Sequence, residues 1–79
     1  MIGILGGMGT QACLDFCNKL AKLNRGKIDQ KYPLFVLYNK SDVPGRPENI
    51  NKYNNVLQSL IKGCLLLQKS KCKFIVMPC

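Results

Sequence analysis

The chain has 79 residues, of which 47% are hydrophobic, and it carries a net charge of +8. This length allows at most one small domain, and the apolar fraction is typical of globular proteins and argues against disorder. No stretch approaches the roughly 20 apolar residues that span a bilayer, and no basic signal segment precedes the first apolar run. We therefore expect a cytoplasmic protein with no membrane association.

The positive charge is spread along the chain. Lysines are scattered from Lys19 to Lys73 and never form a block of five like charges. Nucleic-acid-binding proteins usually show a basic cluster or a known motif, and neither is present here. We do not expect a nucleic-acid partner.

Cysteine and histidine usage argues against a metal centre. The chain has five cysteines, no CxxC pair and no histidine. An odd number of cysteines without paired spacing predicts neither a disulfide framework nor a zinc ribbon. Cys13 and Cys17 have the spacing of neighbours on a helix, but two thiols are a weak metal signal. We interpret both, with Cys64 and Cys72, as small apolar side chains that fill a core.

Hydrophobic periodicity divides the chain into alternating strands and helices. Continuous apolar runs predict strands, and apolar residues at intervals of three or four predict helices. A loop with two prolines and a glycine separates the second strand from the second helix. The expected elements are a strand at 1–5, a helix at 11–23 capped by Thr10, a polar connection at 27–33, a strand at 34–38, a loop at 39–47, a helix at about 48–69 and a strand at 74–77.

The order β-α-β-α-β predicts a three-layer α/β fold with a parallel sheet and helices packed on its faces. In such sheets, ligands bind outside the carboxyl ends of the strands. Three segments would meet at that edge: residues 6–10, 39–46 and 78–79. The sequence therefore predicts a binding site formed by all three.

The first of these segments lies in the glycine-rich stretch IGILGGMG, residues 2–9. A glycine-rich turn between a strand and a helix exposes backbone N–H groups to a phosphate or carboxylate. Residues 7–12 (GMGTQA) also fit the dinucleotide fingerprint, but the acidic residue expected at the end of the second strand is missing, and Asp42 lies beyond it in the loop. A P-loop is excluded because no GK[ST] follows. A third interpretation is a tight turn that only packs helix against strand.

The last segment favours a catalytic role. The third strand, FIVMPC, ends on Cys79 at the edge where α/β proteins place their chemistry. Cys79 is therefore the cysteine that we expect to be functional.

Four motifs together resemble the aspartate/glutamate racemase family, whose members work without pyridoxal phosphate. They are IGILGGMG (2–9), DQKYP (29–33), VPGR (43–46) and FIVMPC (74–79). The resemblance runs from Met1 to Cys79 and implies that residues 1–79 form the N-terminal lobe of a two-lobed racemase fold whose second lobe is absent. The family interconverts the L- and D-forms of acidic amino acids, and its intact members are expected to form homodimers.

The resemblance also assigns roles to residues. Each lobe of the family supplies one cysteine, and the two transfer protons on opposite faces of the substrate's Cα. By position, Cys79 is the first-lobe catalytic cysteine, and Arg46 matches an arginine that contacts a substrate carboxylate. Met8, with Gly7 and Gly9, belongs to the loop that lines the substrate site.

Asn39, at the end of the second strand, completes the expected substrate-binding set, and no cofactor or metal is expected. Because the chain places only one cysteine at the edge of the sheet, we expect it to be inactive alone. The alternative function is a non-catalytic, Rossmann-like module that binds an anion or nucleotide.

Overall fold

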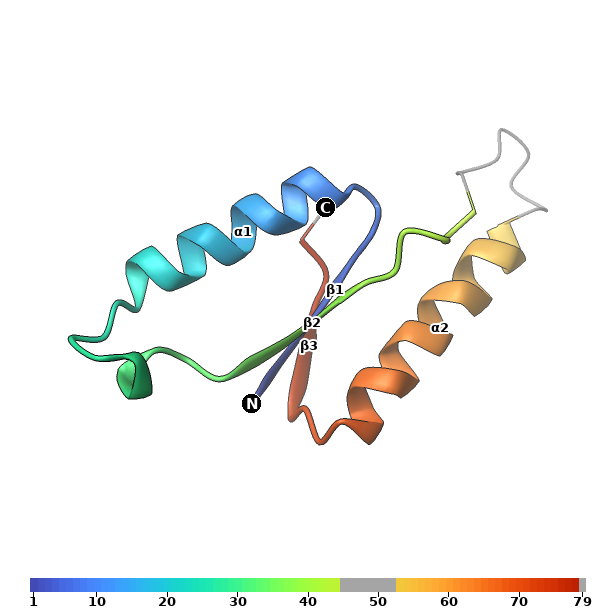
Figure 1. Ribbon diagram of the computed structural model, residues 1–79. Helices are drawn as coiled ribbons and strands as arrows, with labels where there is room; N and C mark the ends of the chain where they lie inside the picture. The colour runs from blue at the N-terminus through green and yellow to red at the C-terminus, as the bar shows by residue number, and fades with distance from the viewer. Residues whose placement is uncertain (45–52, 79) are drawn as a thin grey trace.

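The computed structural model describes residues 1–44 and 53–78 (Figure 1). Its elements follow the predicted order. They are β1 (Ile2–Gly6), α1 (Thr10–Leu23), a one-turn 3₁₀ helix η1 (Asp29–Lys31), β2 (Phe35–Asn39), α2 (Tyr53–Lys69) and β3 (Phe74–Val76). The predicted β-α-β-α-β arrangement is confirmed.

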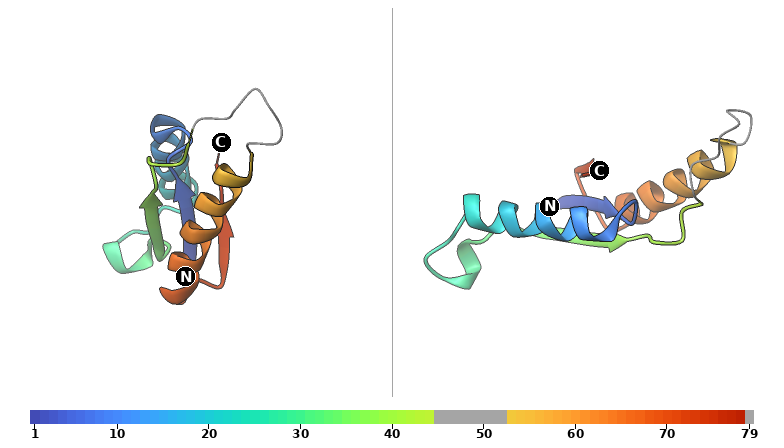
Figure 2. Two further views of the ribbon diagram at one scale, coloured as in Figure 1. Left: turned by 90° about the vertical axis from the view of Figure 1, so that its right-hand side faces the viewer. Right: turned by 90° about the horizontal axis from the view of Figure 1, so that it is seen from above.

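The three strands form one parallel sheet in the order β2-β1-β3. β1 lies in the centre, with Ile2 paired to Phe35 on one side and to Phe74 on the other. The connection from β1 to β2 and the connection from β2 to β3 run in opposite directions across the sheet. Parallel crossovers are almost always right-handed, so these two connections place their helices on opposite faces. Figure 2 shows this arrangement, with α1 and α2 on either side of the sheet. The predicted three layers are therefore present.

The predicted boundaries shift at several places. β1 extends to Gly6, and α1 begins at Thr10 with Gly9 as its N-cap, so the prediction that Thr10 caps the helix is wrong. No side chain caps this helix, so the capping preference of threonine, on which the prediction rested, is not used here. The connection at 27–33 contains η1, which has too few residues for a detectable period. Residues 48–52 of the predicted second helix lie outside the described residues.

The core is small and is centred on β1. Ile4 and Leu67 are completely buried, one on the central strand and one on α2. Leu5, Cys13 and Val56 are also buried, and α2 contacts all three strands while α1 contacts β1. The interpretation of Cys13 as a core residue is confirmed, whereas Cys17, Cys64 and Cys72 are half-buried.

Many large apolar side chains remain exposed on the described surface. They include Leu23, Ile28, Leu34, Leu57, Ile61, Leu65, Leu66, Phe74 and Met77. Neither described helix is both long and apolar enough to cross a membrane.

Candidate active site at the carboxyl edge of the sheet

The carboxyl ends of the three strands meet at one edge, as predicted. Gly6, the last residue of β1, is paired with Asn39, the last residue of β2. On the other side of β1, Ile4 is paired with Val76, and Met77 and Pro78 follow β3 toward the same edge. This edge therefore collects the glycine loop, the end of β2 and the residues that follow β3.

The described part of the edge contains four of the predicted site residues: Gly7, Met8, Gly9 and Asn39. Met8 is half-buried, whereas Gly9 and Asn39 are exposed. The other two, Arg46 and Cys79, lie outside the described residues. Their assignment therefore stays a prediction.

Gly7 holds the loop against the end of β2. Its φ is +118°, which residues with a side chain rarely adopt, and a Cβ on Gly7 would overlap the carbonyl of Lys40. The Lys40 N–H donates a hydrogen bond of 2.9 Å to the carbonyl oxygen of Gly6. Only glycine at position 7 allows the two backbones to approach this closely, which fixes the direction in which the loop leaves β1.

The start of α1 offers unsatisfied backbone donors. Gly9 is the N-cap, no side-chain cap hydrogen bond is made, and the first turn carries no acidic residue. A Cβ on Gly9 would meet nothing within 4 Å, so the space on that side of Gly9 is open. The first N–H groups of a helix lack intrahelical partners and sit at the positive end of its dipole. This end of α1 has the physical properties of a carboxylate- or phosphate-binding site.

Gly6 brings that helix end close to the sheet. A Cβ on Gly6 would lie 2.9 Å from the Cβ of Cys13 and would overlap its sulfur. The absence of a side chain at position 6 lets Cys13 pack directly onto the strand. The first turn of α1 is thereby held against β1.

A cavity of about 10 Å³ lies at this edge. Its lining residues are Leu5, Gly6, Met8, Leu60, Met77 and Pro78. Such a volume is about that of one water-sized probe, so an amino acid does not fit inside it. Pro78 and Met8 nevertheless line the same cavity, so the residue before Cys79 lies against the glycine loop.

Lys40 is a feature of this edge that sequence reasoning missed. It follows Asn39 directly and is only 8% exposed, and its ammonium group forms a 2.6 Å ion pair with Asp42. Its stem runs beside α2, because a Cβ on Gly63 would lie 3.3 Å from the Lys40 Cδ. The one available signal was the position of a lysine immediately after an apolar strand. Its burial depends on Gly63, which is 23 residues away in the sequence.

Asp42 is engaged by this lysine. The hydrogen bond from Lys40 is the main cause that lowers the pKa of the Asp42 carboxyl below its ordinary value. A dinucleotide site needs an acidic residue at the end of β2 to bind the ribose, and that position is Asn39. The arrangement gives the dinucleotide alternative no support.

The cysteines of the described residues do not reach this edge as reactive groups. Burial, followed by the nearby Cys17, raises the pKa of the Cys13 thiol. A raised pKa and burial make a cysteine unreactive. Cys64 and Cys72 instead line a groove between α2 and the start of β3.

Comparison with known families agrees with the resemblance seen in the sequence. The family profile described as Asp/Glu/Hydantoin racemase matches residues 5–79. The chain belongs to the Asp/Glu/hydantoin racemase family.

A relative in Bacillus subtilis (strain 168), the broad specificity amino-acid racemase RacX, is 30% identical over 83 residues. The alignment covers 100% of this chain and 36% of RacX, so the chain spans about a third of that relative. No solved structure matches the chain.

Proposed function

We propose that this chain contributes one lobe of a cofactor-independent amino-acid racemase that acts on aspartate, glutamate or a closely related acid. Family membership supports the reaction class, and RacX is itself an amino-acid racemase. The observation that carries the proposal is the edge of the sheet, where the glycine loop that leads into the uncapped α1 lines one cavity with the residues that lead to Cys79.

The proposed reaction is a proton exchange at the substrate's Cα. The thiolate of Cys79 takes the α-proton and becomes a thiol, while a cysteine from a second lobe donates a proton to the opposite face and becomes a thiolate. The configuration at Cα is inverted and no electron is gained or lost. In the reverse direction the two cysteines exchange roles.

Carboxylate binding lowers the barrier of this reaction. Removal of the α-proton places negative charge on the neighbouring carboxylate, and preorganised donors stabilise that charge as it develops. The N–H groups at the start of α1 are suitable donors, and Arg46 would add two parallel hydrogen bonds to the carboxylate. Cationic and helix N-terminal surroundings also favour the thiolate form of a nearby cysteine, whose ordinary pKa is about 8.5.

We expect the 79-residue chain to be inactive alone. Racemisation by this route needs an acid and a base on opposite faces of one carbon. The cavity of about 10 Å³ at the edge is too small for an amino acid, and Cys13, whose thiol packs against Gly6, is buried. The second lobe would supply both the missing wall and the second cysteine.

A chimera tests the proposal. Residues 1–79 replace the aligned segment of RacX, and α-deuterium incorporation into L-aspartate, L-glutamate and other L-amino acids is followed by NMR in D2O. We expect exchange in the chimera and none in the 79-residue chain. The Cys79→Ser variant of the chimera should lose at least 100-fold in rate, because a general base contributes roughly 10²–10⁴-fold.

The matched control is the Cys64→Ser variant, since Cys64 is half-buried on α2 and lines a different groove. Its rate should stay within about threefold of the parent chimera. A folded chimera whose Cys79→Ser variant exchanges deuterium as fast as its Cys64→Ser variant would rule out Cys79 as the base. Preference for an apolar amino acid over both acidic ones would reject the substrate class while leaving the reaction type standing.

A further inference from the structure

Lys40 is a buried cation at the edge of the candidate active site, and the proposed reaction assigns it no role. Its side chain is only 9% exposed, although lysine is rarely buried without a specific partner. It follows Asn39, the last residue of β2. A methionine would fill similar space without the cost of burying a charge, so packing alone does not account for the ammonium group.

The backbone of Lys40 contacts the glycine loop through the peptide groups on both sides of the residue. Its N–H donates a hydrogen bond of 2.9 Å to the carbonyl oxygen of Gly6. Gly7 lies directly on the peptide bond that follows, because a Cβ on Gly7 would overlap the Lys40 carbonyl and lie 2.8 Å from the Ser41 nitrogen. The orientation of this peptide bond therefore determines where Gly7 lies, and with it the path of the chain into α1.

The side chain of Lys40 holds the same peptide bond at two points. Its stem lies against α2, where a Cβ on Gly63 would come within 3.3 Å of the Lys40 Cδ. Its ammonium group donates a charge-assisted hydrogen bond of 2.6 Å to the carboxylate of Asp42, two residues further on. The ion pair spans the turn that contains Ser41. One residue thus joins α2, this turn and the glycine loop.

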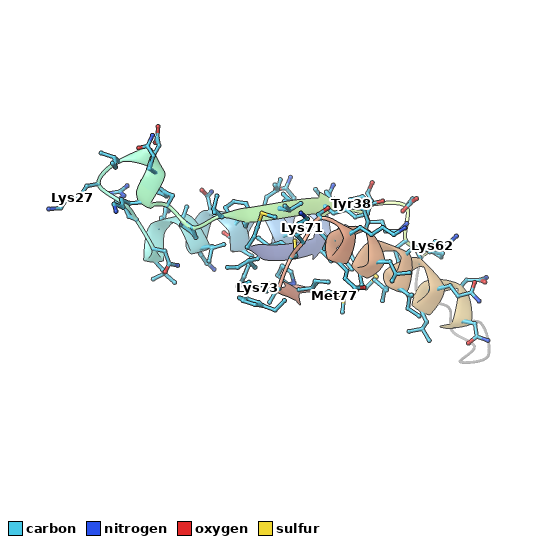
Figure 3. The ribbon with its side chains drawn as sticks, turned by 90° about the horizontal axis from the view of Figure 1, so that it is seen from below. Lys27, Tyr38, Lys62, Lys71, Lys73 and Met77 are labelled. Atoms are coloured by element: carbon cyan, nitrogen blue, oxygen red, sulfur yellow. The ribbon has the colours of Figure 1, made fainter. Side chains whose placement is uncertain are left out.

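Lys62 is a second cation near Asp42 and provides a comparison. The pKa of the Asp42 carboxyl is lowered mainly by the hydrogen bond from Lys40, and also by the charge of Lys62 on α2. Lys62 is exposed, and Figure 3 shows it near the segment that follows β2. Within the described residues, no hydrogen bond joins Lys62 to the glycine loop. Lys62 therefore supplies a similar charge near Asp42 without the contacts of Lys40.

We propose that Lys40 is a positioning residue of the candidate active site: its side chain, held between α2 and Asp42, keeps the peptide bond after Lys40 against Gly7 and so orients the start of α1. The inference rests on the proposed function, in which the N–H groups at the start of α1 bind the substrate carboxylate. Functional groups need neighbours that are themselves locked by packing and hydrogen bonds, and Lys40 is locked by both. The contacts that carry the inference all lie within residues 6–63, so none depends on an open surface.

The RacX chimera tests this role through its kinetics. Lys40→Met keeps an apolar stem and removes the ammonium group. We expect kcat/KM for the best acidic substrate to fall at least about tenfold, with a rise in KM, because a displacement of about 1 Å can cost about 100-fold in rate. Lys62→Met changes the net charge equally and should stay within about twofold of the parent. A loss of folded molecules lowers kcat alone, so the rise in KM separates positioning from a general loss of stability.

Amide exchange on the 79-residue chain tests the inference without racemase activity. In Lys40→Met, the N–H at position 40 should exchange at least about tenfold faster relative to that of Ile4, in the middle of β1, because the loop opens locally. Lys62→Met should leave this ratio unchanged. If Lys40→Met does not fold, Asp42→Asn removes the partner instead, at a side chain that is 77% exposed, and should change both measurements in the same direction.

The outcomes separate the two proposals. An inactive parent chimera would reject the proposed function, and amide exchange alone would then decide the role of Lys40. The inference is wrong if Lys40→Met loses no more kcat/KM than Lys62→Met, or if its KM is unchanged. It is equally wrong if exchange at position 40 and at Ile4 accelerates by the same factor, because the ion pair would then stabilise the whole fold and not the loop.

Discussion

The Gly7→Ala substitution tests how the glycine loop is held at the candidate site. Gly7 has a φ of +118°, and an alanine Cβ there would overlap the backbone carbonyl of Lys40. A backbone carbonyl cannot rotate away as a flexible side chain can. The Lys40 N–H is also bound to Gly6, so the two segments cannot separate without losing that hydrogen bond.

The expected loss follows from two costs. A side chain in a sparsely populated backbone region costs about 1–3 kcal/mol, and overpacking adds about 1–3 kcal/mol. Alanine regains about 0.4–1 kcal/mol because it restricts the unfolded chain. The net destabilisation is roughly 1–6 kcal/mol, a large part of the roughly 4–12 kcal/mol expected for a domain of this size.

Gly9→Ala is the matched control for this prediction. Its Cβ would meet nothing within 4 Å, and the φ of Gly9 is −113°, which alanine adopts freely. We expect a loss of no more than about 1 kcal/mol, because alanine is a poorer N-cap than glycine but meets no steric obstacle at this position. Urea unfolding followed by far-UV circular dichroism measures the free energy of unfolding of both variants. If the Gly7→Ala chain is already unfolded without urea while the Gly9→Ala chain is folded, the result also agrees with the prediction. If the two variants unfold within 0.5 kcal/mol of each other, the close approach of the loop to Lys40 is not what determines its conformation.

Three further predictions concern the core, the ion pair and the buried thiol. Ile4→Ala should destabilise the fold by about 2–5 kcal/mol in urea unfolding, because the Ile4 side chain is completely buried. Leu23 is 85% exposed, so Leu23→Ala should cost less than about 0.5 kcal/mol. Equal losses in the two variants would contradict the assigned core. The pKa of Asp42 is lowered in the folded state, so its contribution to stability is present above its unfolded value of about 3.9 and disappears as the pH falls through the folded value. Asp42→Asn should therefore flatten the loss of stability below about pH 4, and unchanged pH profiles would show that the pair with Lys40 contributes nothing. Among the described cysteines, Cys13 should react most slowly with iodoacetamide in peptide mapping, because it is 1% exposed and its pKa is raised. Early alkylation of Cys13 would mean that α1 readily separates from the sheet.

Most of the secondary structure could be predicted because its signals are local. The apolar runs of β1, β2 and β3 and the helical spacing of α1 need no information from distant residues. The predictions failed where contacts between residues distant in the sequence determine the structure. Thr10 is a good capping residue by composition, yet the helix begins at Thr10 itself because the docked loop makes Gly9 the N-cap.

The candidate site, too, could be predicted only in part. Its position at the carboxyl edge followed from strand order, and Gly7, Met8, Gly9 and Asn39 are found there. The burial of Lys40 could not be predicted, because lysine is usually exposed and only the packing of α2 through Gly63 encloses its stem.

The sequence alone determined the family, the alternation of strands and helices, and the edge at which their carboxyl ends collect. These properties depend on residue type and spacing, which are present in any conformation of the chain. The tertiary structure decided which glycine is indispensable and which lysine is buried. Those outcomes depend on which backbone and side-chain atoms come within van der Waals distance, and that is set only when the helices pack on the sheet.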